Sequence, residues 1–457
     1  MLLGLEKLKY RLLGAIKGDL YKYSQPVQGD FNDLQPGEFD WWKYKYYIRQ
    51  IEYGEKGKHI EEFFAKQNMD FSLPKDFETH GTFTMTAGGD LLTGDQLTVE
   101  TTKHLWDDIR PFYFENTDIV YANLETPIAA SQPVRNAPRS VNETPKLNGT
   151  EGMLNRYLCN GNGINFFSTA NNHCLNQGEE GLIETLELLD KKGIPQVGTA
   201  RTKEEQADIP VIEKNGVRVA YIAYTFTLNG DKAPAGKEYM VNHIRLNNPG
   251  EDLSLIKRHV SIAHERKANV IVAFLHWSLE FEAYPIENII KMGHRVLEEC
   301  GVDIIIGNHA HVIQPLERYE FTDPISIEKK NGLIAYSLGN LVADFNTANS
   351  LLSILLRIQI TKGIQNGKEK TVISGLEVRP FYTLKEYRNG VIKNIRLLDF
   401  LNLLEQLAGD INYYGLTNRQ VRELKRLEKL FFKLMPDLPE QVVKTTYKSS
   451  KTGGRHD

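Results

Sequence analysis

The chain has 457 residues, of which 41% are apolar and 25% are charged, so it is long enough for one large folded domain with extensions. Its formal charge of −4 gives no basic surface, which excludes a nucleic-acid partner. Cys159, Cys174 and Cys300 are too few and too scattered for a disulfide framework or a zinc knuckle, and they indicate a reducing, cytoplasmic location.

The first twenty residues predict an amphipathic helix, because five apolar residues recur at helical spacing. These residues are Leu5, Leu8, Leu12, Ile16 and Leu20. Charged residues from Glu6 to Arg11 interrupt the apolar runs, so we expect neither a signal peptide nor a transmembrane segment. We expect the apolar stripe to pack on the rest of the protein. The alternative is peripheral contact with an anionic membrane surface.

Residues 1–79 as a whole read as a helical, aromatic-rich N-terminal extension. Its aromatic residues Trp41, Trp42 and Tyr46 predict that it docks on another part of the structure. No catalytic pattern is present there.

Between residues 80 and 360 short apolar runs alternate with helical stretches, which is typical of an α/β domain. The predicted strands are 82–87, 118–123, 164–171, 216–225, 269–276, 302–307 and 332–339. Two predicted helices, 178–193 and 287–301, each end on glycine, the preferred residue just past a helix end. Residues 361–457 predict a C-terminal extension with further strand, a helix over 417–435 and a disordered tail at 449–457.

Polar side chains suited to metal binding follow the predicted strands. They are Asp90, Glu125, Asn172 with His173, His276, and His309 with His311. Open α/β sheets place their sites outside the carboxyl ends of the strands, so we expect these side chains to converge. Carboxylate, amide and imidazole without thiolate favour manganese, iron or zinc. The sequence therefore predicts a site for one or two divalent ions.

Each residue taken alone has a simpler interpretation. Asp90 after two glycines could be a turn or cap residue, and His276 could be a hydrogen-bonded buried histidine. We expect Glu280, Glu282 and His294 to be solvated or locally paired. The pair His309 and His311 is more specific, because side chains two apart on an extended segment point the same way.

The ordered motifs GGDLLTG, NLETPI, ANNHCLNQGEEGL, HWSLEFE, GNHAHVIQPLE and YSLGNLVADF resemble the CapA family, named for poly-γ-glutamate capsule synthesis. The resemblance covers residues 81–345. It implies a two-sheet α/β sandwich of the calcineurin-like metallophosphoesterase type, with helical N- and C-terminal extensions here. Relatives of this family are often held at the outer face of a membrane by an N-terminal anchor, which this sequence does not show.

The resemblance also implies roles for single residues. Asp90, Glu125, Asn172, His276, His309 and His311 match metal-ligand positions, and His173 matches a histidine that protonates the leaving group. Five departures alter the pattern. Leu92 and Glu125 stand where phosphoesterases carry a histidine and an aspartate, and Asn308, Asn176 and Ser278 replace a histidine, an aspartate and a glycine common in CapA proteins. Leu92 and Glu125, which replaces an aspartate, suggest that one metal position is weaker or empty.

The function that we expect is metal-dependent hydrolysis of a phosphoester or a γ-glutamyl-type amide by a metal-activated water, with Glu125 bridging two ions. Arg135 and Arg139 could meet an anionic polymer or phosphoester substrate, although charged loops are often simply solvated. The competing hypothesis is a non-catalytic, metal-binding component of a polymer synthesis or export complex, since fold alone does not decide function.

Overall fold

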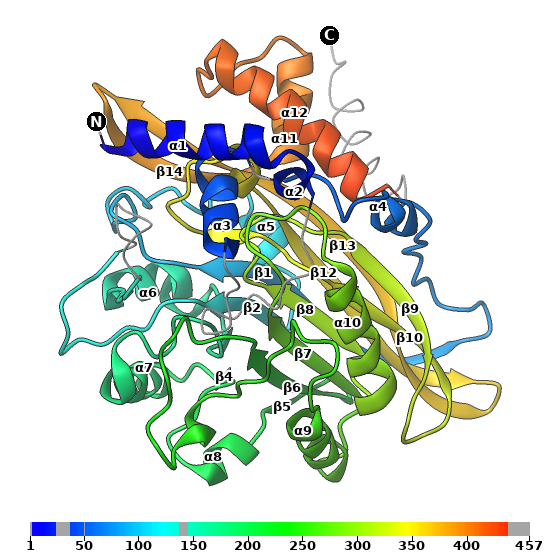
Figure 1. Ribbon diagram of the computed structural model, residues 1–457. Helices are drawn as coiled ribbons and strands as arrows, with labels where there is room; N and C mark the ends of the chain where they lie inside the picture. The colour runs from blue at the N-terminus through cyan, green and yellow to red at the C-terminus, as the bar shows by residue number, and fades with distance from the viewer. Residues whose placement is uncertain (1, 24–36, 50, 137–144, 437–457) are drawn as a thin grey trace.

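Two β-sheets packed face to face form the centre of the molecule in the computed structural model, with helices on their outer faces (Figure 1). The structure describes residues 2–23, 37–49, 51–136 and 145–436. The prediction of a two-sheet α/β sandwich with helices toward both ends of the chain is confirmed. The predicted disordered tail, 449–457, lies outside the described residues.

The larger sheet has eight strands in the order β14-β13-β12-β1-β2-β3-β4, and β11 also pairs with β1. Strands β1 to β4 are parallel to one another, whereas β12, β13 and β14 continue the sheet in antiparallel fashion. The bounds are β1 Glu78–Leu91, β2 Ile119–Leu124, β3 Phe166–Ser168, β4 Gln196–Val197, β11 Asn340–Val342, β12 Leu352–Gln365, β13 Lys368–Arg388 and β14 Val391–Asp399. The predicted boundary between residues 360 and 361 falls inside β12.

The smaller sheet has six strands in the order β5-β6-β7-β8-β10-β9. Its four inner strands are parallel, and the two edge strands run antiparallel to them. The bounds are β5 Val211–Lys214, β6 Val217–Thr225, β7 Val270–His276, β8 Ile304–Asn308, β9 Leu316–Thr322 and β10 Lys329–Ala335. Parallel strands in both sheets therefore bring several carboxyl ends to one edge of the sandwich.

The helices cover the outer faces and the two ends of the sandwich. Those of the central part are α5 Arg110–Tyr113, α6 Glu151–Leu158, α7 Gly178–Lys191, α8 Lys203–Ala207, α9 Ser254–Glu265 and α10 Glu287–Cys300. Those toward the ends of the chain are α1 Leu2–Lys17, α2 Asp19–Lys22, α3 Glu38–Tyr47, α4 His59–Phe64, α11 Phe400–Ala408 and α12 Asn418–Leu434. None of the helices within the described residues is long and apolar enough to cross a membrane.

Strand β2 shows how alternation along a strand builds two cores. Ile119 and Tyr121 face the space between the sheets, whereas Val120 and Ala122 face the outer layer that contains α6. Between the sheets the ring of Tyr121 lies flat on Phe274 of β7, with 3.7 Å between ring centroids. The sheets are thus joined by a tightly packed aromatic contact directly below the carboxyl ends of β2 and β7.

The predicted C-terminal helix is confirmed as α12. Its N-terminus has a capping box, in which Thr417 and Gln420 satisfy each other's backbone N–H groups. The expected apolar face is buried, through Leu424, Leu427 and Phe431.

The N-terminal helix forms as predicted, but our expectation that its apolar stripe packs on the protein is wrong. The stripe is exposed to solvent. The exposed fractions of Leu5, Leu8, Leu12, Ile16 and Leu20 range from 49% to 78%. Helix α1 instead packs on α3 by its opposite face. Tyr10 is buried against Tyr47, and Gly14 allows the close approach, since a Cβ there would lie 2.2 Å from the ring of Tyr44.

Helix α3 docks on the central domain, as its aromatic residues predict. It lies between α1 and the sheets (Figure 1). Trp42 and Tyr46 stack on each other and both contact Phe281. Lys45, whose side chain is only 1% exposed, pairs with Glu282 at 2.9 Å. The N-terminal extension is therefore held to the loop that follows β7.

Candidate metal centre

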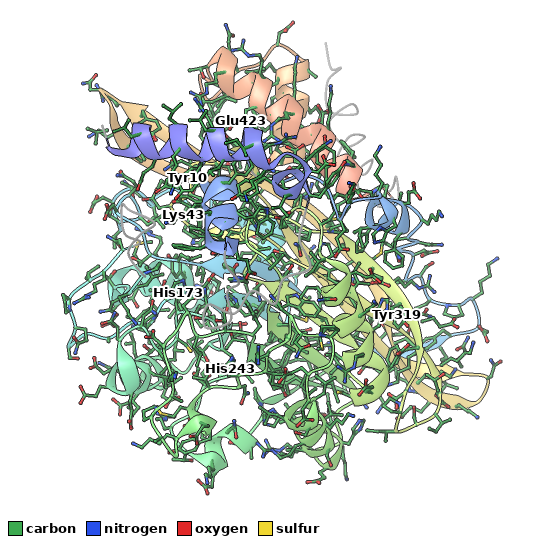
Figure 2. The ribbon with its side chains drawn as sticks, viewed as in Figure 1. Tyr10, Lys43, His173, His243, Tyr319 and Glu423 are labelled. Carbon is green, nitrogen blue, oxygen red and sulfur yellow. The ribbon has the colours of Figure 1, made fainter. Side chains whose placement is uncertain are left out.

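Five strands bring the predicted ligands together. Asp90 lies at the end of β1 beside Asn123 of β2, and His276 ends β7 beside Asn308 of β8. Glu125, Asn172 and His173 follow β2 and β3, and His309 and His311 follow β8. All seven side chains are buried, and Figure 2 labels His173 at mid-height on the left of the view. The convergence that the sequence predicts is present.

The first group of ligand atoms belongs to Asp90, Glu125 and His311, and these atoms lie within 4.8 Å of one another. His311 Nδ1 is 3.6 Å from Asp90 Oδ2, and His311 Nε2 is 3.8 Å from Glu125 Oε1. Asn123 donates a hydrogen bond of 2.8 Å to Asp90 Oδ1, and the backbone N–H of His309 donates to Oδ2. These bonds fix the orientation of the Asp90 carboxylate.

The second group consists of Glu125, His276 and His309, again with ligand atoms within 4.8 Å of one another. His276 Nε2 is 3.4 Å from Glu125 Oε1 and 2.9 Å from Asn172 Oδ1. The rings of His276 and His309 are 4.8 Å apart. Glu125 therefore belongs to both groups, which is the position of a bridging ligand.

Three buried polar atoms in this cluster have no hydrogen-bond partner among the described residues: both carboxylate oxygens of Glu125 and Nδ1 of His309. Native proteins rarely bury such atoms without a partner, because the desolvation cost is then not offset. Divalent cations bound in the two groups would supply partners for such atoms. The residues present thus fit the ion that the sequence predicts.

The pKa values of the ligand residues also show the effect of burial. Burial raises the pKa of Asp90 to about 7 and that of Glu125 well above its usual value. Burial also lowers the pKa of His311 to about 3 and those of His276 and His309 well below their usual range. The imidazoles are therefore neutral at neutral pH, the form in which histidine binds a metal.

The backbone after β8 is in the left-handed region at both histidines, with φ of 91° at His309 and 56° at His311. This conformation is uncommon for residues other than glycine, and such strain gathers at functional sites. It also means that the two imidazoles are not aimed by simple strand alternation, the reason that favoured this pair in the sequence.

His173 lies at the start of a hydrogen-bonded chain that leads away from the cluster. Asn176 Oδ1 accepts from the backbone N–H of Leu147 and, at 2.8 Å, from His173 Nδ1, while Asn176 Nδ2 donates to Asp231. Because Nδ1 carries the proton in this arrangement, Nε2 of neutral His173 holds the lone pair. Burial lowers the pKa of His173 to about 4.

Three residues that depart from the family pattern have defined contacts or backbone conformations in the structure. Leu92 is buried against Leu147 and Ala343 and offers no ligand. Ser278 has a φ of 76°, a conformation that favours the glycine common at this position. Asn308 donates to the hydroxyl of Tyr121, so it links the two sheets below the cluster.

Of the two arginines expected to meet substrate, only Arg135 lies within the described residues, and it is not part of the cluster. Arg135 is exposed and pairs through its backbone with Asn148, and Arg139 lies outside the described residues. Their role in substrate binding stays a prediction.

The expectation that Glu280 and Glu282 are solvated or locally paired is wrong. Glu282 is fully buried and paired with Lys45, far away in the sequence. Glu280 is 21% exposed, its Oε1 lies 3.7 Å from His311 Nε2, and its Oε2 accepts a hydrogen bond from Trp42. His294 is paired too, with Glu317 of β9. Glu280 is thus a carboxylate at the cluster that sequence reasoning missed, although it follows His276 by only four residues.

Comparison with known proteins agrees with the motifs. Residues 84–345, more than half of the chain, match the family described as bacterial capsule synthesis protein PGA_cap. The capsule biosynthesis protein CapA of Bacillus anthracis is 25% identical over 322 residues, which cover 65% of this chain and 72% of the relative. The PGA biosynthesis protein CapA of Bacillus subtilis is 25% identical over 301 residues, 64% of this chain and 71% of the relative.

A solved structure, the calcineurin-like phosphoesterase YfkN from Bacillus subtilis, aligns with 80% of this chain and 99% of its own at 12% identity and a TM-score of 0.37. A score of this size does not by itself carry a conclusion about activity. The family match is decisive without it, because it covers the strands and loops that form the cluster. The chain belongs to the PGA_cap family of bacterial capsule synthesis proteins.

Proposed function

We propose that this protein is a metal-dependent hydrolase that acts on an anionic polymer of the capsule type or on a phosphoester. The observation that supports the proposal is Glu125, a fully buried carboxylate whose two oxygens lack partners between two sets of histidine and carboxylate ligands. A structural metal site is usually closed by four ligands, whereas this cluster has more candidates than one ion requires. The surplus favours two ions with positions open for water and substrate.

Asp90, Glu125 and His311 would hold one ion, and Glu125, His276, His309 and Asn172 the other. Mn²⁺, Fe²⁺ and Zn²⁺ suit this mixture of oxygen and imidazole ligands. When bound, such ions lower the pKa of water toward 7 and polarise the oxygen of the scissile bond.

The chain's own residues would do the rest. His173 Nε2, free of the hydrogen bond that occupies Nδ1, would carry a proton to the leaving group. The negative charge of a bound substrate favours protonation of this imidazole, which burial otherwise disfavours. Asn176 would keep the ring in this orientation.

Relatives named for capsule and PGA biosynthesis suggest an anionic polymer as the substrate. The exposed stripe of α1 suggests contact with a membrane. Leu5, Leu8, Leu12 and Ile16 share an exposed face, and exposed Lys9 and Arg11 lie on the same helix. Apolar side chains with basic neighbours suit the surface of an anionic membrane. We therefore include peripheral membrane contact through α1 in the proposal.

The test combines metal content with an activity panel. Protein purified without chelator should hold at least one equivalent of transition metal per chain. It should also hydrolyse a phosphodiester, a phosphomonoester or a γ-glutamyl peptide with Mn²⁺ or Zn²⁺, and lose that activity with chelator. Metal-loaded protein inactive on all three classes would favour the non-catalytic component instead. Protein that cannot be loaded with metal would contradict both functions.

A further inference from the structure

Compared with the family pattern, the first group of ligands lacks one side chain. Asp90, Glu125 and His311 supply three side chains, and Leu92, where phosphoesterases carry a histidine, points its apolar side chain into a small core. An ion held there would lack one protein ligand of the usual set. The structure places another carboxylate, Glu280, at the same histidine.

Two carboxylate oxygens lie near His311 Nε2, the ring nitrogen that does not bond to Asn340. Asn340 Nδ2 donates to two backbone carbonyls, so its Oδ1 is the acceptor of the 3.0 Å hydrogen bond from His311 Nδ1. Nε2 is then the ring nitrogen left to bind an ion. Glu125 Oε1 lies 3.8 Å from this nitrogen, and Glu280 Oε1 lies 3.7 Å from it.

These separations are too long for hydrogen bonds. They suit two ligands of one ion, because atoms about 2.1 Å from a common metal lie roughly 3 to 4 Å apart. The distance from Glu280 Oε1 to His311 Nε2 is therefore one that two ligands of a shared cation have.

Helix α3 fixes Glu280 from outside the family-matched region. The indole N–H of Trp42 donates to Glu280 Oε2, and Lys45 Nζ donates to the backbone carbonyl of Glu280 at 2.9 Å. The same Lys45 pairs with buried Glu282. Both ends of the residue, the carboxylate and the main chain, are thus held by two side chains one helical turn apart.

The loop that carries Glu280 has a conformation that depends on these contacts. Ser278 and Phe281 have φ of 76° and 63°, in the left-handed region on either side of Glu280. Phe281 packs against the rings of Trp42 and Tyr46. Without α3 the loop would lose the aromatic contacts that hold this strained path.

We propose that Glu280 is a further ligand of the ion held by Asp90, Glu125 and His311, and that Trp42 and Lys45 are positioning residues that hold it there. The N-terminal extension is then part of the metal centre. This inference rests on the proposed metal-dependent function and assigns a residue to one of its two ions.

The test measures metal binding rather than activity, on the full-length chain. Metal-free protein is titrated with Mn²⁺ or Co²⁺ against a competing chelator, and the Co²⁺ spectrum reports the ligand set. We expect two ions in the wild type, and in Glu280→Gln a loss of at least tenfold in affinity for one of them with a changed Co²⁺ spectrum. Trp42→Phe should weaken the same ion by about tenfold, the lower end of the usual effect of residues that orient ligands.

Trp41→Phe is the matched control. Trp41 neighbours Trp42 on α3 and is buried, but its indole N–H has no acceptor among the described residues. Its ring lies under Lys45 Nζ, at 3.7 Å, and phenylalanine keeps an aromatic ring at that place. The substitution should leave both ions bound as tightly as in the wild type. Circular dichroism and thermal unfolding of each variant would show that the fold is kept.

The outcomes separate this inference from the proposed function. Wild-type protein that binds no metal would overturn the proposed metal centre itself. Two ions bound equally tightly by wild type and Glu280→Gln would overturn only the assignment of Glu280. Weakened binding in Glu280→Gln with none in Trp42→Phe would keep the ligand and reject the role of α3.

Discussion

The candidate centre depends on Glu125, because this residue belongs to both of the ligand groups that form the cluster. Neither of its carboxylate oxygens forms a hydrogen bond with another described residue. The histidines on either side, His309 and His311, belong to different groups, so their joint removal tests both ion positions at once.

We predict that the double variant His309→Gly and His311→Gly keeps its fold and loses its metal. Glycine is chosen because both positions have positive φ, where a residue without Cβ is free of strain. Metal content by elemental analysis should fall from the wild-type value to near zero. His294→Ala, which removes a histidine paired with Glu317 outside the cluster, should leave it unchanged. Full metal occupancy in the double variant would show that the centre is misplaced.

A second prediction separates proton transfer from metal binding. His173→Ala should retain metal and lose activity by about 10²–10⁴-fold, the usual contribution of a general acid or base. Metal content and kcat on the best substrate of the panel are the two measurements. An active His173→Ala protein would leave the enzyme assignment in place and remove His173 from the mechanism.

The ligand residues could be predicted from the sequence because they follow strands, and strand ends can be recognised from apolar runs. Glu280 could not be recognised in that way. Its direction is set by the left-handed backbone at Ser278 and Phe281 and by Trp42, which lies 238 positions away in the chain. A pattern of alternating residues contains neither of these determinants.

Among the elements, the seven predicted strands are all present, each with small shifts at its ends. Strands β4, β5, β9, β11, β12 and β14 were not predicted, and β13 lies in the part of the C-terminal extension where further strand was expected. Strand β4 has two residues, and β5 and β9 are edge strands with partly exposed side chains, so none gives a continuous apolar run. Edge strands are the elements for which hydrophobic pattern is least informative.

Helix α1 illustrates the same limit in another form. The spacing of leucines correctly predicts the helix, but it does not tell which face touches the protein. The contacts of Tyr10 and Gly14 with the aromatic residues of α3 decide that, and they leave the leucines exposed.

We predict that this exposed face binds anionic vesicles. The triple variant Leu8→Gln, Leu12→Gln and Ile16→Gln should reduce binding by at least tenfold, since each buried apolar side chain contributes roughly 1.5–3 kcal/mol. Co-sedimentation with vesicles that contain phosphatidylglycerol is the measurement. Ile327→Gln, an equally exposed apolar residue between β9 and β10, is the control and should bind as the wild type does. Equal binding by the triple variant, or a wild type that forms dimers through this face instead, would contradict membrane contact.

For the molecule as a whole, the buried pair of Lys45 and Glu282 joins the N-terminal extension to the central domain. Removing one partner leaves an unpaired buried charge, which typically costs about 3–5 kcal/mol. We therefore predict that Lys45→Met lowers the free energy of unfolding by that amount, measured with urea. Lys56→Met, which breaks an exposed pair with Asp19, should change it little. A Lys45→Met protein as stable as the wild type would show that the extension is only loosely attached.

Metal removal should also destabilise the whole domain, because an ion that binds only the folded state stabilises it in proportion to its free concentration. At about 1,000 times the dissociation constant this amounts to about 4 kcal/mol. Thermal unfolding of the wild type with Mn²⁺ and with chelator should therefore differ by several degrees. Identical melting temperatures would indicate that the cluster binds no ion under these conditions.

The stacked pair of Tyr121 and Phe274 has a consequence for which ion is accepted. One sheet supplies Asp90 and Glu125, and the other supplies His276, His309 and His311, so the gap between the sheets would set the size of the space for an ion. That gap is fixed below the cluster by rings 3.7 Å apart and by the Tyr121 hydroxyl, which bonds Ser168 and Asn308. Zinc-type ions bind oxygen at about 2.0–2.2 Å and calcium at about 2.3–2.6 Å. If the cluster binds ions as we propose, sheets that cannot separate would select against large cations by ionic radius.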